Sequence, residues 1–584
     1  MRVPFDIAAL VLQATDWLLP NTDTVATRPL LSHETQVYLG AVQQRWGVPG
    51  AAIGIVTGPK HTFKDEWKAE YLSLGIADGK GNPVTEKSLF SIASNSKLFT
   101  AISIGMLIEN NTIVPSTGKF LDWDTKIIDV LPDWKIQDEY ATNNLDIVDL
   151  LSMRSGLPSH DLHHQSGIPL ADFIHNLRNL PMNAEIRQTF QYNNQHYVTI
   201  GQMVSVLSQR SFVEYVQHHI FDPLGLEMTY NHTAAATTGL RTHAFAHVGV
   251  NRTECFEKSD LENGEMDQSC RGETKSYGWW TKGDAIDNAA PGGIVSNIGD
   301  VVTWLQELLC PVHLPKSLIA KCASPIMFMT DPTLPHCSPF LYGMGQIMFT
   351  YRGEQVVEHT GGLPGQTSLI LRLPERDLGV AILTNDFLAG PHFFQAAAYR
   401  ILDDLLGLEP YDYEKVIFDR RFPAPVETKW PVNPSPPKEG FQSIPGRYFQ
   451  PGYGDLDIHL FDNPTGDWVG RSIVSQLALM GVIPDASSLP EASYIAVTTR
   501  TFLTHWVFTH HDKGVFNVTT FAFFDAADGS GPPLSDLSAQ GAAVFNGRGV
   551  GLFGLDTAGE GAKSWPAVDD EFAEERAGVW FGRQ

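Results

Sequence analysis

The feature that most constrains the fold of this chain is a proline-rich segment in its second half. Between Pro423 and Pro437 the residues read Pro-Ala-Pro-Val-Glu-Thr-Lys-Trp-Pro-Val-Asn-Pro-Ser-Pro-Pro. Proline lacks a backbone N–H and fixes its own φ, so a run this dense forms neither a helix nor a central strand. The segment predicts a linker between two folded units. A chain of 584 residues is also longer than one hydrophobic core usually serves.

The two sides of this linker carry different hydrophobic patterns. Before it, strand-like runs such as Ala51–Val56 alternate with helical periodicity, as in Leu98–Ile108, which predicts a mixed α/β or α+β domain. After it, short apolar or alternating runs such as Leu456–Phe461 and Val515–Phe524 are separated by turn residues. This pattern predicts an antiparallel β domain, for which a barrel is one form. We therefore assign residues 1–29 to an N-terminal extension, 30–405 to the first domain, 406–440 to the linker and 441–584 to the β domain.

Charge and hydropathy exclude two classes of partner. The formal net charge is −25, and no Lys/Arg-rich run is interleaved with aromatics, which argues against nucleic acid. No stretch reaches eighteen consecutive apolar residues, so we expect no membrane-spanning helix. Residues Val3–Leu12 faintly resemble a signal peptide, but Asp6 interrupts their apolar core. We expect a cytoplasmic protein, with secretion as the alternative.

The cysteines are five in number, contain no C-x-x-C pair, and do not predict a zinc site. They are Cys255, Cys270, Cys310, Cys322 and Cys337. Cys255 and Cys270 flank a polar segment and would close a loop in an oxidising compartment, whereas free thiols are the expectation otherwise. The sequence leaves this pairing open.

The residues that carry chemistry begin with Ser94-Asn95-Ser96-Lys97, which follows a strand-like run and opens a segment that we predict to be an amphipathic helix. A spacing of three places both side chains on one helical face, so the Lys97 amine can reach the Ser94 hydroxyl. The helix N-terminus also favours negative charge beside Ser94. Alone, S-x-x-K is weak, because a chain of this length contains it about once by chance.

Two further motifs follow in order and strengthen this interpretation. Tyr192-Asn193-Asn194 lies in a polar run and predicts a turn that presents a phenol and an amide to one cavity, although Tyr192 could instead be a half-buried core residue. His359-Thr360-Gly361-Gly362 stands between two strand-like runs. Its glycines would let the backbone approach a ligand closely, and a plain hairpin turn is the alternative.

Ser-x-x-Lys, Tyr-x-Asn and His-Thr-Gly in this order resemble the serine β-lactamase and penicillin-binding-protein superfamily, and within it the class C β-lactamase-like branch. The resemblance covers roughly residues 30 to 405. It implies an α+β fold, in which an antiparallel sheet is flanked by helices and joined by a helical subdomain. Several flanking segments are similar as well: Val48-Pro49-Gly50, Leu150–Leu157, Pro223–Leu226, Pro291-Gly292-Gly293 and Tyr342–Gly345.

This resemblance implies a role for each motif residue. Ser94 would be the nucleophile, Lys97 its proton acceptor or electrostatic partner, and Tyr192 the general acid/base that relays protons with the leaving group. The substrate would contact the following residues: Asn194, His359, Thr360, Gly361 and Gly362. The backbone N–H groups of Ser94 and Gly362 would form the oxyanion hole. No metal and no cofactor is implied.

Three features depart from the family pattern. The antibiotic-hydrolysing members usually carry lysine where this chain has His359, which is more similar to the esterase, transacylase and D-aminopeptidase relatives. Asn193 replaces a commoner small residue. Residues 251–275 are rich in Glu, Asp and Gly and look like an insertion that could border the cleft. A true β-lactamase is therefore disfavoured.

The β domain resembles the lipocalin-like barrels appended to some longer members, and the two-part chain is similar to representatives from filamentous fungi that serve natural-product pathways. We expect a serine hydrolase that acts on a small-molecule ester, thioester or amide through an acyl-enzyme on Ser94. The alternatives are an acyltransferase and a catalytically silent binding protein. The oligomeric state is not predicted.

Three other signals were weighed and set aside. Gly549–Gly554 fits G-x-G-x-x-G but lies in the β domain, outside any strand-helix-strand unit. The segment His160–His164 lacks the spacing of a metal site and predicts a polar loop near the cleft. G-x-S-x-G is absent, which argues against an α/β-hydrolase.

Overall fold

The structure, a computed structural model, describes residues 29–584 apart from a set of gaps. The gaps are 63–65, 166, 249, 251–271, 280–287, 333, 422–432, 463–465, 481, 484–488, 490–491, 528–533, 556–565 and 567–572. Cys255, Cys270, most of the predicted insertion and nearly all of the N-terminal extension lie outside the described residues. Within the described residues, no helix is long and apolar enough to cross a bilayer.

The first domain is built on an eight-stranded antiparallel sheet in the order β2-β1-β12-β11-β10-β9-β8-β7. The strands are β1 (Gly50–Thr57), β2 (Lys68–Gly75), β7 (Met327–Thr330), β8 (Phe340–Tyr342), β9 (Ile347–Tyr351), β10 (Glu354–Leu363), β11 (Gln366–Leu373) and β12 (Leu378–Thr384). Every residue of β1, β11 and β12 is buried, because helices cover both faces of the sheet.

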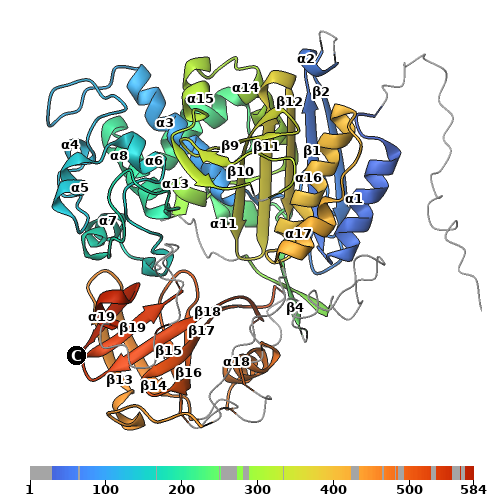
Figure 1. Cartoon of the computed structure of the whole chain (residues 1–584). Helices are drawn as coiled ribbons and strands as arrows, with labels where there is room; N and C mark the ends of the chain where they lie inside the picture. Colours follow the sequence, from blue (N-terminus) through green and yellow to red (C-terminus); the bar gives the residue numbers. More distant parts are fainter. Residues whose placement is uncertain are drawn as a thin grey trace, which may run out of the picture.

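One face of the sheet carries α1 (His33–Arg45), α16 (Gly390–Leu406) and α17 (Tyr413–Arg421) (Figure 1). The other face packs on α14 (Ile298–Leu309), where Gly54 gives Ile298 and Val302 room to approach β1. Helix α17 falls within the range 406–440 that we assigned to the linker. Its residues Tyr413 and Ile417 are buried, so this part of the range is packed helix that belongs to the first domain.

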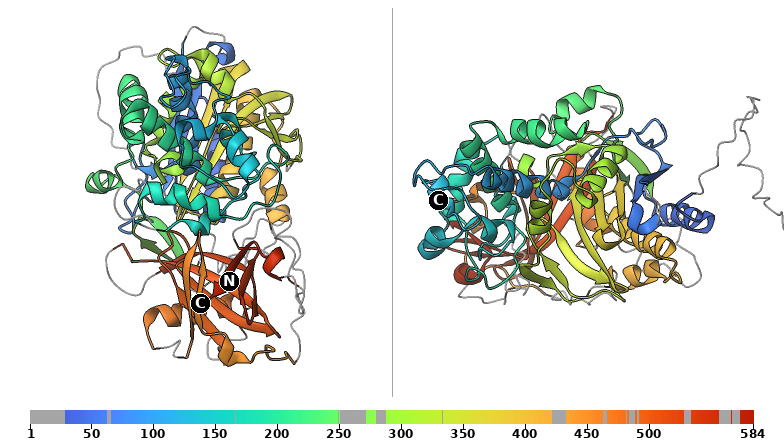
Figure 2. Two further views of the ribbon diagram at one scale, coloured as in Figure 1. Left: turned by 90° about the vertical axis from the view of Figure 1, so that its left-hand side faces the viewer. Right: turned by 90° about the horizontal axis from the view of Figure 1, so that it is seen from above.

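A helical subdomain lies beside the sheet and is joined to it by the central helix α3 (Lys97–Glu109) (Figures 1 and 2). Its larger helices are α5 (Glu139–Asn144), α6 (Ile147–Leu151), α7 (Leu170–Asn176), α8 (Asn194–Ser208) and α9 (Phe212–Val216). The α+β fold that we predicted is confirmed. The prediction that α3 is amphipathic is wrong: ten of its residues are buried, because α8, α13 (Ala289–Gly292) and α15 (Lys316–Cys322) enclose it.

The C-terminal part is a closed antiparallel barrel of eight strands, as predicted (Figure 1). The strands are β13 (Gly446–Gln450), β14 (Gly454–Leu460), β15 (Ser493–Val497), β16 (His505–Asp512), β17 (Val515–Phe524), β18 (Leu534–Asn546), β19 (Gly549–Phe553) and β20 (Val579–Arg583). Helix α18 (Trp468–Leu479) packs Ile473 and Leu477 against the barrel wall. The G-x-G-x-x-G segment is strand β19 and its end. A Cβ on Gly549 would lie 2.3 Å from the Phe581 carbonyl oxygen, so close strand packing explains this glycine.

The two domains meet at a set of buried hydrogen bonds. Arg500 is almost fully buried and donates from Nη1 to the carbonyl oxygens of Leu162 (2.7 Å) and Tyr453 (3.1 Å). The Tyr453 hydroxyl lies 2.6 Å from His160 Nδ1, and Gln165 Nε2 donates to the Tyr453 carbonyl (2.9 Å). The barrel is therefore held against the loop that follows residue 157 of the first domain.

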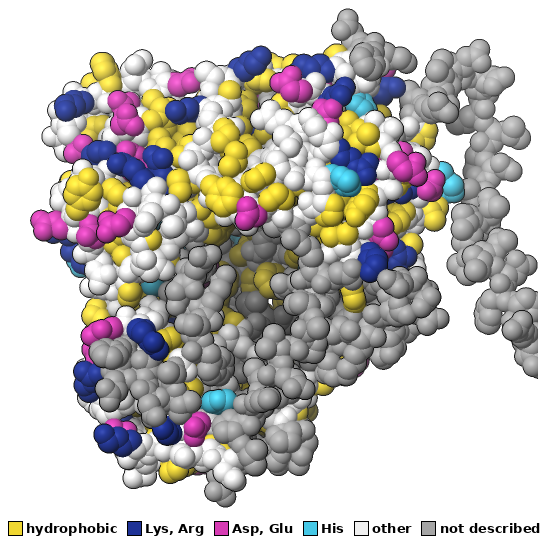
Figure 3. All heavy atoms as spheres, viewed as in Figure 1, with side chains coloured by type: hydrophobic (Ala, Val, Ile, Leu, Met, Phe, Trp, Pro, Cys, Tyr) yellow, Lys and Arg dark blue, Asp and Glu magenta, His cyan; other side chains and the backbone are white. Residues whose placement is uncertain are grey.

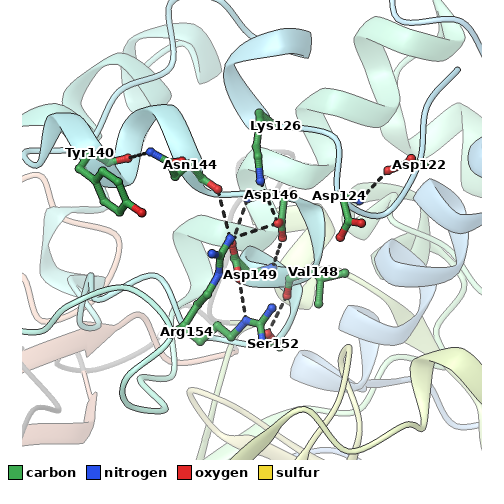
Figure 4. Close-up of polar contacts among 11 residues, drawn as sticks. Asp122, Asp124, Lys126, Tyr140, Asn144, Asp146, Val148, Asp149, Ser152 and Arg154 are labelled. Atoms are coloured by element: carbon green, nitrogen blue, oxygen red, sulfur yellow. Dashed lines mark hydrogen bonds and ion pairs between the residues drawn. The ribbon is translucent and has the colours of Figure 1, made fainter. Parts of the chain in front are cut away.

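A buried ionic cluster fixes the helical subdomain where its chain turns toward the site (Figure 4). Asp149 is fully buried, and its Oδ1 accepts from Arg154 Nε (2.7 Å) and Arg187 Nε (2.9 Å). Asp146 accepts from Lys126 (3.1 Å) and Arg187 (3.2 Å). Although burial raises the pKa of Asp149, its hydrogen bond from Arg187 and the nearby positive charges hold it below its ordinary value. The carboxylate is ionised and holds both arginines.

We predict that Asp149→Asn lowers the free energy of unfolding by about 1–3 kcal/mol, because it removes the buried carboxylate that accepts hydrogen bonds from the partly exposed Arg154 and Arg187. Chemical denaturation followed by circular dichroism measures the change. Asp455→Asn is the matched control, since Asp455 is partly exposed and pairs with Arg447 at the surface, where such a pair contributes about 0–1 kcal/mol. Equal losses in the two variants would contradict the role of the buried cluster.

Candidate active site

Ser94 lies in a 3₁₀ turn, η2 (Ala93–Ser96), between the short strand β3 (Phe90–Ser91) and helix α3. Ala93 has a φ of +48°, a left-handed conformation that is unfavourable for a residue with a side chain. The turn is held by Ser368, whose Oγ donates to the Ile92 carbonyl (2.8 Å) and accepts from Asn95 Nδ2 (2.9 Å). Ser94 is thereby left half-buried at a cavity wall.

Lys97 is fully buried one turn after Ser94. Its Nζ lies 3.0 Å from Ser94 Oγ and donates to Asn194 Oδ1 (2.7 Å) and to the Pro291 carbonyl oxygen (3.0 Å). It also stands over the ring of Tyr192, 4.8 Å from the centroid. Burial lowers the pKa of the Lys97 amine to about 7, and the negative charge of Asp161 opposes this change. Near neutral pH the amine is therefore readily deprotonated.

Tyr192 approaches Ser94 from the loop that precedes α8. It is enclosed by the protein and hydrogen-bonded to Ser94, and burial raises the pKa of its phenol above the ordinary value. Residues 191–193 form an irregular segment rather than the predicted turn, and Asn194 already begins α8. Asn193 is the N-cap of α8 and donates from Nδ2 to the Leu157 (3.2 Å) and Pro158 (2.8 Å) carbonyls. Asn193 therefore caps α8 and ties its beginning to the segment that follows residue 156.

The ionic cluster supports this loop through the backbone. Arg187 donates its backbone N–H to the Arg154 carbonyl (2.7 Å), and Gln191 donates to the Met153 carbonyl (2.8 Å). Both acceptors belong to the segment that Asp149 anchors. The position of Tyr192 therefore depends on charges that do not contact Ser94.

His359 faces the same side of the sheet as Lys97 but is buried behind Tyr192, with ring centroids 6.2 Å apart. Its Nδ1 lies 2.5 Å from the Thr360 carbonyl oxygen, and its Nε2 lies 3.1 Å from the Tyr342 hydroxyl. This pattern fits a neutral ring that carries its proton on Nδ1. Burial, and then the charge of Lys97, lower the pKa of His359 to about 3. The position therefore supplies no positive charge.

Residues His359 to Gly362 all lie inside strand β10, and the hairpin turn that we weighed as an alternative comes later, between Leu363 and Gln366. The ladder between β10 and β9 ends at Glu358, so the following edge of β10 runs beside η2. A Cβ on Gly361 would lie 2.3 Å from the Ile92 carbonyl oxygen. Glycine is required here for the strand to touch the turn that carries Ser94.

A cavity of about 460 Å³ opens beside Ser94 between the two domains, where Figure 3 shows the molecule hollowed. Of the predicted site residues, Ser94, Asn194 and Gly362 line it. Lys97, Tyr192 and His359 stand behind this wall, and Thr360 and Gly361 line a different cavity. The structure thus brings Ser94, Lys97, Tyr192 and Asn194 together, whereas Thr360 and Gly361 do not line the cavity beside Ser94.

The barrel supplies part of the cavity wall through Phe502, Leu503, Gly554 and Leu555. Phe502 also packs with Leu363 and Ala93 in a small apolar cluster. No sequence pattern indicates this contribution of the barrel. Phe502 and Leu503 lie in the loop before β16, and Gly554 and Leu555 follow the end of β19; neither segment contains a recognisable motif. The packing of the two domains places them near Ser94.

Asp161 is the second residue that we did not predict individually. It begins the short turn η3 (Asp161–His163), lines the cavity with Leu162, and accepts from Asn194 Nδ2 at 3.0 Å. A chain of contacts therefore runs from Asp161 through Asn194 to Lys97. The only sequence signal was the polar segment His160–His164, whose expected place near the cleft agrees with this geometry. No group of three or more metal-ligating side chains occurs in the part of the chain that the structure describes.

Comparisons with known proteins find relatives of this chain. The chain is 25% identical to the unguisins hydrolase ungD of Aspergillus violaceofuscus over 450 residues, which cover 71% of this chain and 74% of that protein. It is 26% identical to unguisins hydrolase ungD' of Aspergillus campestris over 436 residues, or 71% of this chain and 75% of that protein.

A solved structure, that of the octameric penicillin-binding protein homologue from Pyrococcus abyssi, aligns with 90% of this chain and 98% of its own. The TM-score is 0.53 at 17% sequence identity, which supports the fold alone. The Beta-lactamase family model matches residues 40–404, more than half of the sequence. The chain therefore belongs to the Beta-lactamase family.

Proposed function

We propose that this protein is a serine hydrolase that forms an acyl-enzyme on Ser94 and cleaves an amide, ester or thioester bond of an uncharged small molecule. The observation that carries the proposal is the contact between Ser94 Oγ and Lys97 Nζ at 3.0 Å, made where burial lowers the pKa of the amine to about 7. The cavity beside Ser94 provides space for the substrate. The similarity to two proteins named as hydrolases supports the same class of reaction.

The two candidate bases differ in their readiness to take a proton. Lys97 is neutral in a large fraction of molecules near pH 7, whereas Tyr192 keeps its proton because burial raises the pKa of its phenol. We therefore assign the base to Lys97 and the proton donor to Tyr192. A base whose pKa lies near the working pH is also the more effective one.

Acylation would proceed in two steps. Ser94 Oγ attacks the substrate carbonyl carbon and gives its proton to neutral Lys97, while the carbonyl π electrons move to the oxygen. The tetrahedral intermediate then collapses and breaks the bond to the leaving group, which takes a proton from Tyr192, and Lys97 returns a proton to the phenolate. Water attacks the acyl-enzyme in the same way, so the acid is released and Ser94 regains its proton.

The charge on the intermediate would fall near the backbone N–H groups of Ser94 and Gly362, the oxyanion hole that the family resemblance implies. Gly362 lines the cavity and has no side chain that would cover its N–H. Losing one such donor typically slows a reaction by about 10²–10³. The close contact of Gly361 with Ile92 sets the distance between the two N–H groups.

The cavity disfavours a substrate carboxylate. Among the lining residues that the structure describes, Asp161 is the single ionisable side chain, and none is lysine or arginine. His359 is neutral where the antibiotic-hydrolysing relatives usually carry lysine. A carboxylate in this cavity would lose its hydration and gain no positive partner. The proposal therefore favours uncharged substrates, and the likeness to the unguisins hydrolases supports a natural product among them.

Acyl transfer to an alcohol or amine is the second candidate. The apolar barrel residues Phe502, Leu503 and Leu555 border the cavity and would limit the water that reaches the acyl-enzyme. Hydrolysis and transfer share every step up to that intermediate. A silent binding protein is the weaker alternative, because Ser94, Lys97 and Tyr192 stand in contact as catalysis requires.

The first test is covalent labelling. We expect wild-type protein incubated with p-nitrophenyl acetate to gain the mass of one acetyl group or to release p-nitrophenol with turnover, and Ser94→Ala to do neither. Intact-protein mass spectrometry and absorbance measure the two outcomes. Ser159→Ala is the matched control, since Ser159 lines the same cavity. Labelling that persists in Ser94→Ala would contradict the assigned nucleophile.

The second test is the pH profile. Because deprotonated Lys97 is the active form, kcat/KM should rise about tenfold per pH unit below pH 7 and level off above it. Asp161→Asn should move the rise to lower pH, since the charge of Asp161 raises the pKa of Lys97. Stopped-flow or steady-state assays between pH 5 and 9 measure both curves. A flat profile, or one that falls across this range, is incompatible with Lys97 as the base.

A further inference from the structure

We infer that a second cavity, on the far side of strand β10, is a substrate subsite that binds a neutral peptide segment extending from the scissile bond. The inference rests on the proposed function, because it concerns the substrate of the same site. The cavity holds about 590 Å³ and is bounded by β10, β11 and the beginning of α16. It is larger than the cavity beside Ser94.

The two cavities are neighbours that share part of their walls. Gly362 and Phe387 line both of them. The backbone of Gly362 and the ring of Phe387 therefore lie at the boundary between the two cavities. A substrate whose carbonyl carbon lies at Ser94 would therefore reach the second cavity by passing Gly362. This also gives Thr360 a place in substrate binding, although it does not line the catalytic cavity.

The lining of the second cavity selects the chemistry of its occupant. Of the lining residues within the described part of the chain, none is Asp, Glu, Lys or Arg, and His392 is the one histidine. Leu334, Leu388 and Ile417 give it apolar surface, and Thr360 and Gln395 give it uncharged hydrogen-bonding groups. A charged group would lose its hydration here and find no partner of opposite charge. A hydrocarbon chain would leave the Gln395 amide and the Thr360 hydroxyl without hydrogen-bond partners. A neutral peptide segment with apolar side chains satisfies both kinds of surface.

One wall of this cavity borders a buried carboxyl group. A smaller cavity of about 40 Å³ shares Thr360 and Gln395 with it and contains Glu358. Burial raises the pKa of Glu358 to about 8, so this carboxyl is protonated at neutral pH. No ionised group therefore borders the proposed subsite through that wall.

The walls of the cavity are held by close packing. A Cβ on Gly390 would lie 2.2 Å from Thr367 Oγ1, so the start of α16 is fixed against β11. Asp386 Oδ1 accepts from the Ala389 N–H at 2.6 Å at the same point. Protein interiors rarely leave space of this size empty, and ligand sites typically occupy about 300–1,000 Å³. A rigid space beside the nucleophile is suited to binding.

The kinetic test compares a short and a long ester. Two longer substrates are used: an N-acetyl-tripeptide p-nitrophenyl ester with apolar side chains, and an acetyl ester whose leaving group carries such a peptide. In wild type we expect kcat/KM for at least one of them to exceed that of p-nitrophenyl acetate at least tenfold. Leu388→Trp fills the cavity and should remove this advantage without changing the acetate rate. Val312→Trp, at a position that is 79% exposed, is the matched control. The inference is overturned if Leu388→Trp still has a higher kcat/KM for the long ester than for p-nitrophenyl acetate. It is also overturned if neither long ester has a higher kcat/KM than p-nitrophenyl acetate in wild type.

A binding test separates this inference from the proposed function. The probe is the matching N-acetyl-tripeptide amide, titrated into Ser94→Ala protein by calorimetry. We expect its Kd to rise about tenfold when Leu388→Trp is added, and to rise when Gln395→Met removes the amide at similar side-chain length. Equal affinity in all three proteins, or no binding, overturns the subsite. If no ester acylates wild-type Ser94, the hydrolase proposal fails, and this titration still decides the subsite.

Discussion

The burial of one amine, that of Lys97, is the constraint on which the rest of the site depends. A lysine that lost its hydration without compensation would be strongly destabilising, and here the amine contacts Ser94, Asn194 and the Pro291 carbonyl. These contacts use residues from three separated parts of the chain. The same burial that requires them also brings the pKa of the amine close to neutral pH. Stability and reactivity at this point have a single physical origin.

The elements around this amine are held by two kinds of close fit. On the sheet side, Gly361 lets strand β10 touch the strained turn at Ala93, and any larger residue would separate them. On the helical side, Asp149 neutralises two arginines and so fixes the loop that leads to Tyr192. The contact at Gly361 depends on the absence of a side chain, and the contact at Asp149 depends on opposite charges. Together they fix the positions of Ser94 and Tyr192, between which the proposed mechanism moves protons.

The sequence predicted the fold class and the barrel, and its three motifs contain the side chains found around Ser94. The spacing of Ser94 and Lys97 predicted that their side chains meet, because a helical turn fixes their distance, but it took the two later motifs to single out this S-x-x-K. Spacing failed for Phe502 and Asp161, since neither has a chemical signature and both reach the cavity only through the packing of the two domains. The sequence pattern also predicted an amphipathic α3, whereas the helix is buried on all sides. Small residues such as Thr100, Ser103 and Gly105 resemble an exposed face in the sequence, although they are buried. No pattern marked the second cavity.

The barrel wall has a consequence for how this protein can change over evolution. Phe502 and Leu503 belong to a loop that is far in sequence from every catalytic motif, yet they form part of the surface that faces the substrate. Arg500 joins that loop to the first domain through the backbone carbonyl of Leu162, a contact that does not depend on the Leu162 side chain. Under the proposed function, substitutions in this barrel loop would change substrate preference without altering Ser94, Lys97 or Tyr192. The proposed chemistry and its selectivity would then depend on two different domains of the chain.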